Sequence, residues 1–398
     1  MTIEVVIVGG GPAGASTALH LVRREGIRPA SIAIVDGATF PREKPCAGAI
    51  SRWGLRALEE IGFTASVPQV KMRGLRVLHG ALGGAGTFEL GVVVRRSEFD
   101  TELLHAARGD GVVVLEGAAL AGLTRRRTGW LVSTSRGEIT ARHVIACDGA
   151  GSRTRKLLGL REPARKGHLY VTETLPVASD AGPRGGLCDF DLGVSNQGLE
   201  GYYWDFPTII GGVAHVSRGI YHANLTPSSR VKEVLEGALL ARGIVPSAVK
   251  LKPFSTRPFV RGTILAHEGV LFVGEAAGID RSTGEGIAQS ILMAAIAARH
   301  VARALRTGAP RFEAYGEEVV RARVGRHLLQ SAWLAERVFG EGGLAFRQFL
   351  ARSPRAREAG ARWYRGERLS RITKARLAGL LAWEAARSLT GKVARAGG

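Results

Sequence analysis

Hydrophobic positions near the start of the chain follow the strand and helix periods in turn. Residues 5–8 (VVIV) form an apolar run that predicts a buried strand, and Pro12–Arg24 predicts a helix. A second apolar run, Ser31–Val35, predicts another strand. Further along, the amphipathic stretch Phe99–Arg108 predicts a helix, and Val112–Glu116 predicts a strand after it. This order of strands and helices is typical of βαβ units with a parallel sheet.

The next part of the chain alternates with a period of two residues. Three such stretches, Leu120–Arg125, Trp130–Thr134 and Glu138–Ala141, predict strands, with a turn at Thr128–Gly129 between the first two. The apolar stretch His143–Cys147 predicts a further strand. A meander within a βαβ domain indicates a mixed α/β fold.

Between about residues 161 and 258 the pattern changes to short strands separated by turns. Strand-like stretches such as Leu169–Leu175, Gly201–Phe206 and Gly212–Gly219 alternate with segments rich in Gly and Pro. We interpret this part as a second, antiparallel sheet.

The first domain is expected to be completed by distant pieces of the chain. Leu265–Val273 predicts a buried strand, and the Ala-rich segment Gly286–Leu305 predicts a long helix. The expected organisation is a discontinuous first domain, a substrate-binding sheet and a helical, basic C-terminal region, at residues 1–160 with 259–310, 161–258 and 311–398 respectively. Strands at about 70–95 could join the substrate sheet, with residues 80–86 (GALGGAG) as their hairpin loop.

Composition narrows the class of protein. With 398 residues the chain is long enough for two or three packed units. Its three cysteines, Cys46, Cys147 and Cys188, form no CxxC motif, and its histidines form no HxxxH motif, so we expect neither a disulfide framework nor a metal site. No basic and apolar leader precedes the first strand, and no apolar stretch reaches the roughly 18 residues of a membrane span. A cytoplasmic location is therefore expected.

The net charge of +20 indicates either a solvated surface rich in arginine or an anionic partner. We expect no nucleic-acid partner, because the arginines are dispersed and no nucleic-acid-binding module accompanies them. The charge excess is steepest after Gly340, where 13 Lys and Arg face four Glu. Apolar residues such as Trp363 and Trp383 interleave with these arginines, as in a helix that lies on an anionic bilayer or packs on the core.

A dinucleotide-binding fingerprint follows the first predicted strand. Gly9 permits a tight turn, Gly11 lets backbone amides approach a pyrophosphate, and Gly14 lets the helix lie close to the strand. Pro12 and Ala13 lie in the same turn, at the helix N-terminus that would bind the phosphates. Asp36 ends the second strand, 22 residues beyond Gly14, where a carboxylate accepts hydrogen bonds from a ribose. The sequence thus predicts bound FAD or NAD.

Further motifs extend over roughly residues 3–305. They are Lys44-Pro45-Cys46-Ala47-Gly48, Arg96-x-x-Phe99-Asp100, Asp148-Gly149-x-x-Ser152-x-x-Arg155, Tyr202-x-Trp204-x-Phe206-Pro207, and Gly274-Glu275-Ala276-Ala277-Gly278 followed by Gly284-Glu285-Gly286. In this order they resemble the geranylgeranyl reductase family of FAD-dependent oxidoreductases, which is related to aromatic hydroxylases and flavin-dependent halogenases. The resemblance implies a Rossmann-like FAD-binding domain and a second-domain sheet that covers the isoalloxazine ring.

The resemblance also implies which residues contact FAD. Besides the fingerprint residues, they are Lys44, Cys46, Ala47, Arg96, Asp148, Gly149, Gly274, Glu275, Gly284, Gly286 and Ile287. Arg96 could instead be a solvated cation, and Glu275 could be an acid favoured by a helix start. The chain departs from the family at Glu275, where Asp is usual, and in the loop 279–283, which is one residue short and has no proline.

Two groups of residues could act on a substrate. Cys46 lies where the family places a residue near the flavin and substrate, so it could donate a proton or simply pack its loop. Tyr202, Trp204 and Phe206 share one face of a predicted strand and could line a prenyl cavity or form an aromatic core. Cys147 and Cys188 are expected to be packing residues.

The resemblance favours an enzyme that reduces C=C double bonds of a hydrophobic polyprenyl substrate by hydride transfer from flavin N5. The alternative enzyme is a flavin-dependent monooxygenase or halogenase of secondary metabolism. A third hypothesis is a peripheral membrane or scaffold protein with a vestigial flavin site. The sequence leaves open whether electrons come from NAD(P)H, from ferredoxin or from another redox partner protein.

Overall fold

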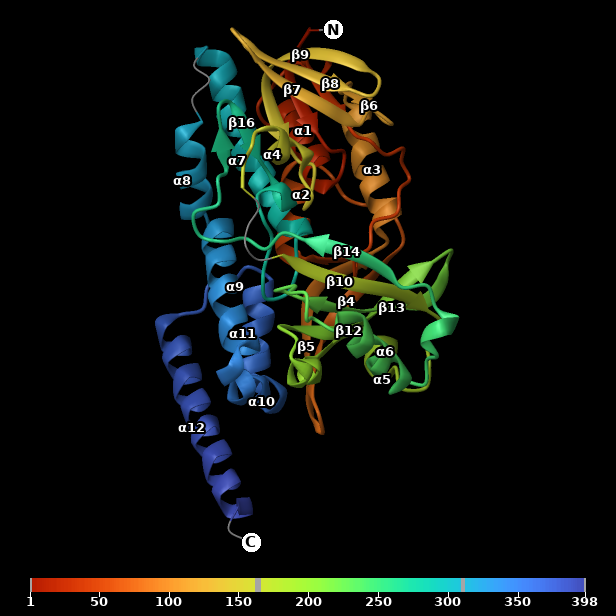
Figure 1. The fold of residues 1–398 in the computed structure, drawn as a ribbon, viewed down its shortest axis with the longest axis vertical. Helices are drawn as coiled ribbons and strands as arrows, with labels where there is room; N and C mark the ends of the chain where they lie inside the picture. The colour runs from red at the N-terminus through yellow and green to blue at the C-terminus, as the bar shows by residue number, and fades with distance from the viewer. Residues whose placement is uncertain (1, 162–165, 309–311, 397–398) are drawn as a thin grey trace. The chain divides into compact units, whose positions relative to one another are not determined.

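The computed structural model describes residues 2–161, 166–308 and 312–396 (Figure 1). The chain divides into two compact units, each built from three segments. Unit 1 contains Met1–Pro68, Val94–Gly167 and Ser255–Ala332, and unit 2 contains Gln69–Val93, His168–Phe254 and Trp333–Gly398. Both units are therefore assembled from segments far apart in the sequence.

Unit 1 is built on a mixed sheet in the order β15-β16-β9-β1-β2-β6, to which the hairpin β7-β8 adds beside β9. The strands are β1 (Thr2–Val8), β2 (Ile32–Val35), β6 (Val113–Leu115), β7 (Leu120–Arg126), β8 (Gly129–Thr134), β9 (Gly137–Ala146), β15 (Ala266–His267) and β16 (Val270–Phe272), and the short strand β3 (Ala49–Ser51) also lies in unit 1. Strand β1 pairs in parallel with β2 and β9, and β9 pairs in parallel with β16. Successive residues Val5, Val6 and Ile7 are all buried, as in a parallel sheet covered on both faces. The expected mixed α/β fold is confirmed.

The helices of unit 1 are α1 (Pro12–Arg23), α2 (Arg52–Glu60), α3 (Arg96–Gly109), α4 (Arg153–Leu157), α7 (Ile287–Thr307) and α8 (Glu313–Arg321). Helix α1 packs against α7 and α3. A methyl group at Gly54 of α2 would lie 2.8 Å from Ala288 Cβ, so small residues allow α2 and α7 to approach closely. Helix α7 thus brings a late segment of the chain against the fingerprint helix.

Unit 2 contains a sheet in which β14, β10, β13, β12, β11, β4 and β5 are successive neighbours. These strands are β4 (Gln69–His79), β5 (Leu82–Val94), β10 (Gly167–Thr174), β11 (Leu187–Asp191), β12 (Gly201–Ile210), β13 (Val213–His222) and β14 (Lys252–Thr256). Strands β10, β13, β12 and β11 pair antiparallel, whereas β11 pairs with β4 in parallel. Helices α5 (Ala181–Arg184) and α6 (Val231–Leu240) also belong to this unit, and Tyr203 of β12 lies in one hydrophobic core with Leu235 of α6.

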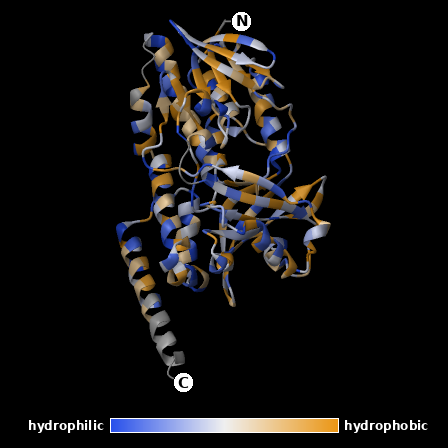
Figure 2. Ribbon diagram, in the orientation of Figure 1, coloured by the Kyte–Doolittle hydropathy of each residue, from blue (hydrophilic) through white to orange (hydrophobic). Residues whose placement is uncertain are grey.

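The C-terminal region is helical, as expected. It contains α9 (Arg323–Phe339), α10 (Leu344–Arg352), α11 (Pro354–Tyr364) and α12 (Arg371–Ala396). Helix α10 packs against α11, α12 and β4 within unit 2. In Figure 2 hydrophilic and hydrophobic colours alternate along α9 to α11. Within the described residues, no helix combines the length and apolar character that a membrane span requires.

Two sequence predictions of local structure are wrong. The predicted single strand Leu265–Val273 is a hairpin of β15 and β16, because Glu268 and Gly269 both adopt positive φ and reverse the chain. The predicted loop 80–86 is mostly strand, since β5 begins at Leu82. Gly84 lies within this strand, and a Cβ there would lie 2.3 Å from the guanidinium of Arg357.

Candidate active site

The turn between β1 and α1 has the geometry that the fingerprint predicts. Gly9 has a φ of 106°, and a Cβ there would lie 2.4 Å from the carbonyl oxygen of Cys147. A Cβ on Gly14 would lie 1.8 Å from the carbonyl oxygen of Gly9, so neither position accepts a side chain. No described side chain caps the N-terminus of α1, where Gly11 precedes Pro12 and Ala13. The N–H groups of the first turn can therefore bind an anion.

Asp36 lies beside this turn. One oxygen of its carboxylate accepts a hydrogen bond of 2.7 Å from Gly10 N, and the other accepts one of 2.8 Å from Ala38 N. A carboxylate has about four lone-pair positions, so two such bonds orient the group and leave capacity for a hydroxyl donor. Its position suits the ribose contact that the sequence predicts.

Lys44 and Glu275 lie together although 231 residues separate them in the sequence. Lys44 Nζ donates to Glu275 Oε2 at 3.2 Å, and the two side chains are 17% and 15% exposed. Burial lowers the pKa of Lys44, while the charge of Glu275 opposes that shift. The neighbouring Gly274 has a φ of 63°, and a Cβ there would lie 2.6 Å from Ser290 Oγ. The two motif loops are thus joined by an ion pair.

Arg96 is buried beside Cys46, which excludes the solvated alternative. It donates two hydrogen bonds of 2.7 and 2.8 Å to Asp100, and Arg42 contacts the same carboxylate at 3.2 Å. Burial alone would lower the pKa of Arg96, but the ion pair with Asp100 and a hydrogen bond to Cys46 outweigh burial and raise it. Cys46 Sγ also accepts from Gly48 N at 3.3 Å, and Ala47 lies between these two residues. The thiol therefore has a fixed position next to a neutralised cation.

Asp148 lies two residues after the end of β9, next to the fingerprint turn. Its Oδ2 accepts a 2.8 Å hydrogen bond from Thr154 N, while its buried Oδ1 has no hydrogen-bond partner among the described residues. A buried carboxylate oxygen without a donor is costly, and a hydroxyl or N–H of a bound dinucleotide would satisfy it. Gly149, with a φ of 78°, has open space where a Cβ would be. The residues present therefore fit a dinucleotide cofactor.

The loop after Glu275 leads into α7. Gly284 has a φ of 69°, and Gly286 forms the N-cap of α7, where a Cβ would lie 2.8 Å from Ile279. No described side chain caps this helix end, and Ile287 at the first position of α7 is buried. Like α1, α7 therefore presents free N–H groups at its N-terminus.

The aromatic side chains of β12 are brought together as predicted for one face of a strand. Tyr202, Trp204 and Phe206 are all buried. Phe190 of the neighbouring strand lies against two of them, with ring centroids 5.2 Å from Tyr202 and 5.1 Å from Phe206. Opposite Trp204 in the pairing stands Gly219, where a Cβ would lie 2.3 Å from the indole. A glycine on β13 thus makes room for Trp204.

The other face of β12 carries a buried charge network that the sequence analysis missed. Arg218 bonds Asp180 and Asp205 at 2.5 and 2.7 Å, and Arg242 bonds Asp205 at 2.6 Å. Tyr203 donates to the same Asp205 at 2.7 Å. The only sequence signal of this network was the alternation of Asp205 with the aromatic residues, because the arginine partners of Asp205 lie 13 and 37 residues away. The sequence analysis also did not predict that Asp100, four residues after Arg96 in the same motif, pairs with both Arg96 and Arg42.

Cys147 and Cys188 are buried in separate strand environments. Burial raises the pKa of both thiols, because it disfavours the charged thiolate. This suits the packing role expected for them.

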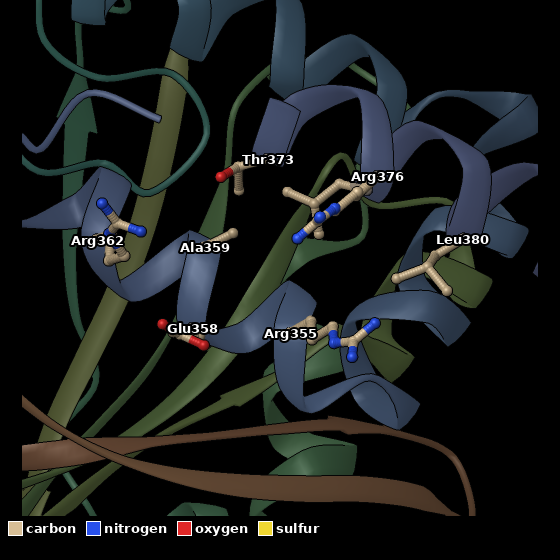
Figure 3. Close-up of a pocket in the computed structure, with 8 residues that line it drawn as sticks. Arg355, Glu358, Ala359, Arg362, Thr373, Arg376 and Leu380 are labelled. Atoms are coloured by element: carbon tan, nitrogen blue, oxygen red, sulfur yellow. The ribbon is translucent and has the colours of Figure 1, made fainter. Parts of the chain in front are cut away.

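A pocket of about 230 Å³ lies between α11 and α12, and its lining residues include none of the predicted site residues (Figure 3). Arg355, Arg362 and Arg376 line it together with Glu358, so its lining carries net positive charge. Its walls also include Leu377 and Leu380.

Comparison with known proteins first identifies the broad class of protein to which this chain belongs. Residues 2–186 match a family model described as an FAD binding domain. The fold is shared with a geranylgeranyl bacteriochlorophyll reductase-like protein from Thermoplasma acidophilum, with a TM-score of 0.75 and 20% identity over 91% of this chain and 96% of that chain. A flavin-dependent brominase shares it too, with a TM-score of 0.70 and 15% identity over 92% and 94%. The protein is an FAD-dependent oxidoreductase.

The sequence comparison is more specific. Digeranylgeranylglycerophospholipid reductase 1 of Methanopyrus kandleri is 30% identical over 315 residues, which cover 75% of this chain and 80% of that protein. The chain belongs to the geranylgeranyl reductase family of FAD-dependent oxidoreductases. The family resemblance seen in the sequence and the expectation of FAD are thereby confirmed.

Proposed function

We propose that this enzyme reduces carbon–carbon double bonds of a hydrophobic, polyprenyl substrate of geranylgeranyl type. The name of the Methanopyrus relative, a digeranylgeranylglycerophospholipid reductase, supports this substrate class. In the proposed reaction one double bond gains a hydride on one carbon and a proton on the other. The observation that carries the proposal is the aromatic face of β12.

This aromatic face suits the charge that such a reaction develops. Hydride addition to an unactivated alkene leaves positive charge on the neighbouring carbon. Tyr202, Trp204 and Phe206 offer π faces that attract a cation, and a desolvated contact of this kind contributes about 2 kcal/mol. We propose that these three side chains line the substrate cavity and stabilise that charge.

Reduced FAD, when bound, supplies the hydride. We propose that the N-termini of α1 and α7 hold its phosphates and ring oxygens through backbone N–H groups, and that Asp36 holds the ribose. Asp148 would accept a hydrogen bond at its unsatisfied Oδ1. Lys44 and Glu275, as one ion pair, would orient the polar part of the cofactor near Cys46.

We propose that Cys46 gives the proton to the second carbon of the alkene. Its Sγ is fixed by Gly48 N and by Arg96, and Asp100 neutralises the charge of Arg96. The thiol would regain its proton from solvent after each turnover, so atoms and charge balance over the cycle. In the alternative role Cys46 packs the loop and another group or water supplies the proton.

The two units have different proposed roles. We propose that unit 1 is the FAD-binding domain and that the sheet of unit 2 binds the substrate. Electrons would come from NAD(P)H, ferredoxin or another redox partner. The arginine-lined pocket of α11 and α12 supports a peripheral contact with an anionic membrane, where a polyprenyl lipid would be found.

A monooxygenase or halogenase activity is the second candidate, and the fold shared with the brominase is compatible with it. In that case the reduced flavin would react with oxygen before the substrate. Fold alone does not distinguish the two reactions.

The proposal is tested by photoreducing the purified yellow protein without oxygen and adding a panel of prenyl diphosphates and prenyl lipids. We expect a polyprenyl compound to reoxidise the flavin anaerobically. The second candidate would be supported instead by two results together. No panel member would reoxidise the flavin faster than buffer does, and oxygen with an aromatic substrate would reoxidise it rapidly.

A further inference from the structure

A buried carboxylate organises the loop before α7. Asp280 is 0% exposed, and its Oδ1 accepts hydrogen bonds from Ser282 N at 2.8 Å, Ser282 Oγ at 2.9 Å and Thr283 N at 2.8 Å. These bonds fold the loop around one oxygen atom. The carboxylate thus constrains the backbone of this loop.

The same carboxylate is bound from outside the loop by α9. Ser331 Oγ donates to Asp280 Oδ1 at 2.5 Å and accepts from Ser282 N at 2.9 Å. His327 Nε2 lies 3.2 Å from Asp280 Oδ2. Because His327 and Ser331 are four residues apart, both lie on one face of α9. All of these residues belong to unit 1.

The carboxylate is held in its charged form. Burial would raise the pKa of Asp280, but hydrogen bonds and charge from His327, with hydrogen bonds from Ser331 and Thr283, lower it below its ordinary value. A charged acceptor forms stronger hydrogen bonds than a neutral one. The loop is therefore fixed to α9 by several strong contacts.

This loop ends at the predicted FAD contacts. Its last residues are Gly284 and Gly286, and Gly286 is the N-cap of α7. Glu285 between them accepts from Ser51 N and Gln289 Nε2, both at 3.2 Å. Any displacement of Asp280 would therefore move the N-terminus of α7 and the backbone N–H groups that would face the cofactor.

We infer that His327 and Ser331 of α9 are positioning residues for FAD, because they hold Asp280 and through it the cofactor-binding loop. Neither residue needs to touch the cofactor. The inference rests on the FAD assignment and not on the proposed substrate.

The experiment compares Ser331→Ala and His327→Asn with a matched control, His300→Asn. His300 is also a buried histidine bound to a carboxylate, with Nε2 2.7 Å from Glu318 Oε2, but it joins α7 to α8. It lies 13 residues beyond Ile287, about 20 Å along the helix. For each purified variant, FAD is removed and re-added, and the dissociation constant, the visible circular dichroism of bound FAD and the melting temperature of the apoprotein are measured.

We expect FAD to bind about tenfold more weakly to Ser331→Ala and His327→Asn, with an altered visible dichroism, because each loses a hydrogen bond to a charged group. His300→Asn should lower the melting temperature while its FAD dissociation constant stays within about twofold of wild type. Ser331→Thr keeps the hydroxyl and should retain FAD binding better than Ser331→Ala.

Wild-type FAD affinity and dichroism in Ser331→Ala would overturn the inference, as would an equal loss of affinity in His300→Asn. If His327→Asn does not fold, the two serine variants decide the question. Since no substrate is present, the outcome is independent of whether the enzyme reduces polyprenyl compounds.

Discussion

Lys44 Nζ lies 3.2 Å from Glu275 Oε2, so the loop after β2 and the loop after β16 are linked by one ion pair. The family resemblance implies Asp, one methylene shorter, at the position of Glu275. The additional methylene of Glu gives the carboxylate the reach to meet Lys44. Glu275 departs from the family motif, but it forms an ion pair with Lys44. We therefore do not interpret the departure as a loss of the cofactor site.

The ion pair should contribute to cofactor binding. In Glu275→Gln the side chain keeps its length but loses its charge, and Lys44 is left as a partly buried cation. We expect about tenfold weaker FAD binding and a loss of about 1 kcal/mol in the free energy of unfolding. Lys44→Met should behave similarly, and the double variant should lose less than the sum of the two. The FAD affinities of the two single variants and the double variant are measured by titration. Additive losses of binding free energy would show that the residues act independently.

The aromatic face of β12 is expected to act in the chemical step. Trp204→Leu should slow the anaerobic reoxidation of the reduced enzyme by its polyprenyl substrate about 30-fold, since about 2 kcal/mol of cation–π stabilisation is lost. FAD binding should not change. Trp204→Phe keeps an aromatic ring and should lose much less. Full activity in Trp204→Leu, measured by stopped-flow absorbance, would remove this side chain from the proposed role.

Stability should depend on pH through Glu285. Burial raises the pKa of Glu285 to about 7 in the folded protein, from an ordinary value of 4.5, although the charge of His327 opposes the shift. The folded state therefore binds this proton more tightly than the unfolded state. Its contribution to stability is present below about pH 4.5 and is lost as the pH rises through 7, with a full effect of about 3 kcal/mol.

Glu285→Gln removes this titration. Between pH 5 and 7 the free energy of unfolding of the apoprotein should fall more steeply with pH for wild type than for the variant. All other side chains, including Asp280 and His327 beside Glu285, are the same in both proteins. Urea unfolding at several pH values measures the difference, and identical slopes would contradict a raised pKa at Glu285.

The buried charge network of unit 2 should be important for stability. Arg218 is 0% exposed and binds two aspartates, so Arg218→Met leaves Asp180 and Asp205 without this partner. We expect a loss of about 3–5 kcal/mol. Arg230 is 76% exposed and pairs with Glu233, so Arg230→Met should change stability by less than about 1 kcal/mol. Chemical denaturation of the two variants should therefore differ strongly, and equal midpoints would refute the argument.

The sequence predicted local structure where a short motif determines it. The turn at Gly9 and Gly14 follows from glycine spacing, and the aromatic face of β12 follows from the alternation of side chains along a strand. The hairpin of β15 and β16 was missed because the apolar run around Glu268 and Gly269 hides a tight turn. Periodicity does not detect a two-residue reversal inside an apolar segment.

The contacts that position the site were not predictable in the same way. Asp280 meets Ser331 from 51 residues away, and Lys44 meets Glu275 from 231 residues away. Such pairs depend on how α9 and the two loops pack in three dimensions. A single sequence indicates that these residues are polar, but it does not indicate which polar residues become partners.

The most direct test of the proposed reaction is a single turnover without oxygen, followed by mass analysis of the product. Photoreduced enzyme is mixed with the polyprenyl compound that reoxidises it in the panel. We predict a product that is heavier by two hydrogens for each flavin oxidised and that contains no added oxygen or halogen. A substrate that is unchanged without oxygen, and that gains an oxygen or halogen atom when oxygen is admitted, would contradict the account.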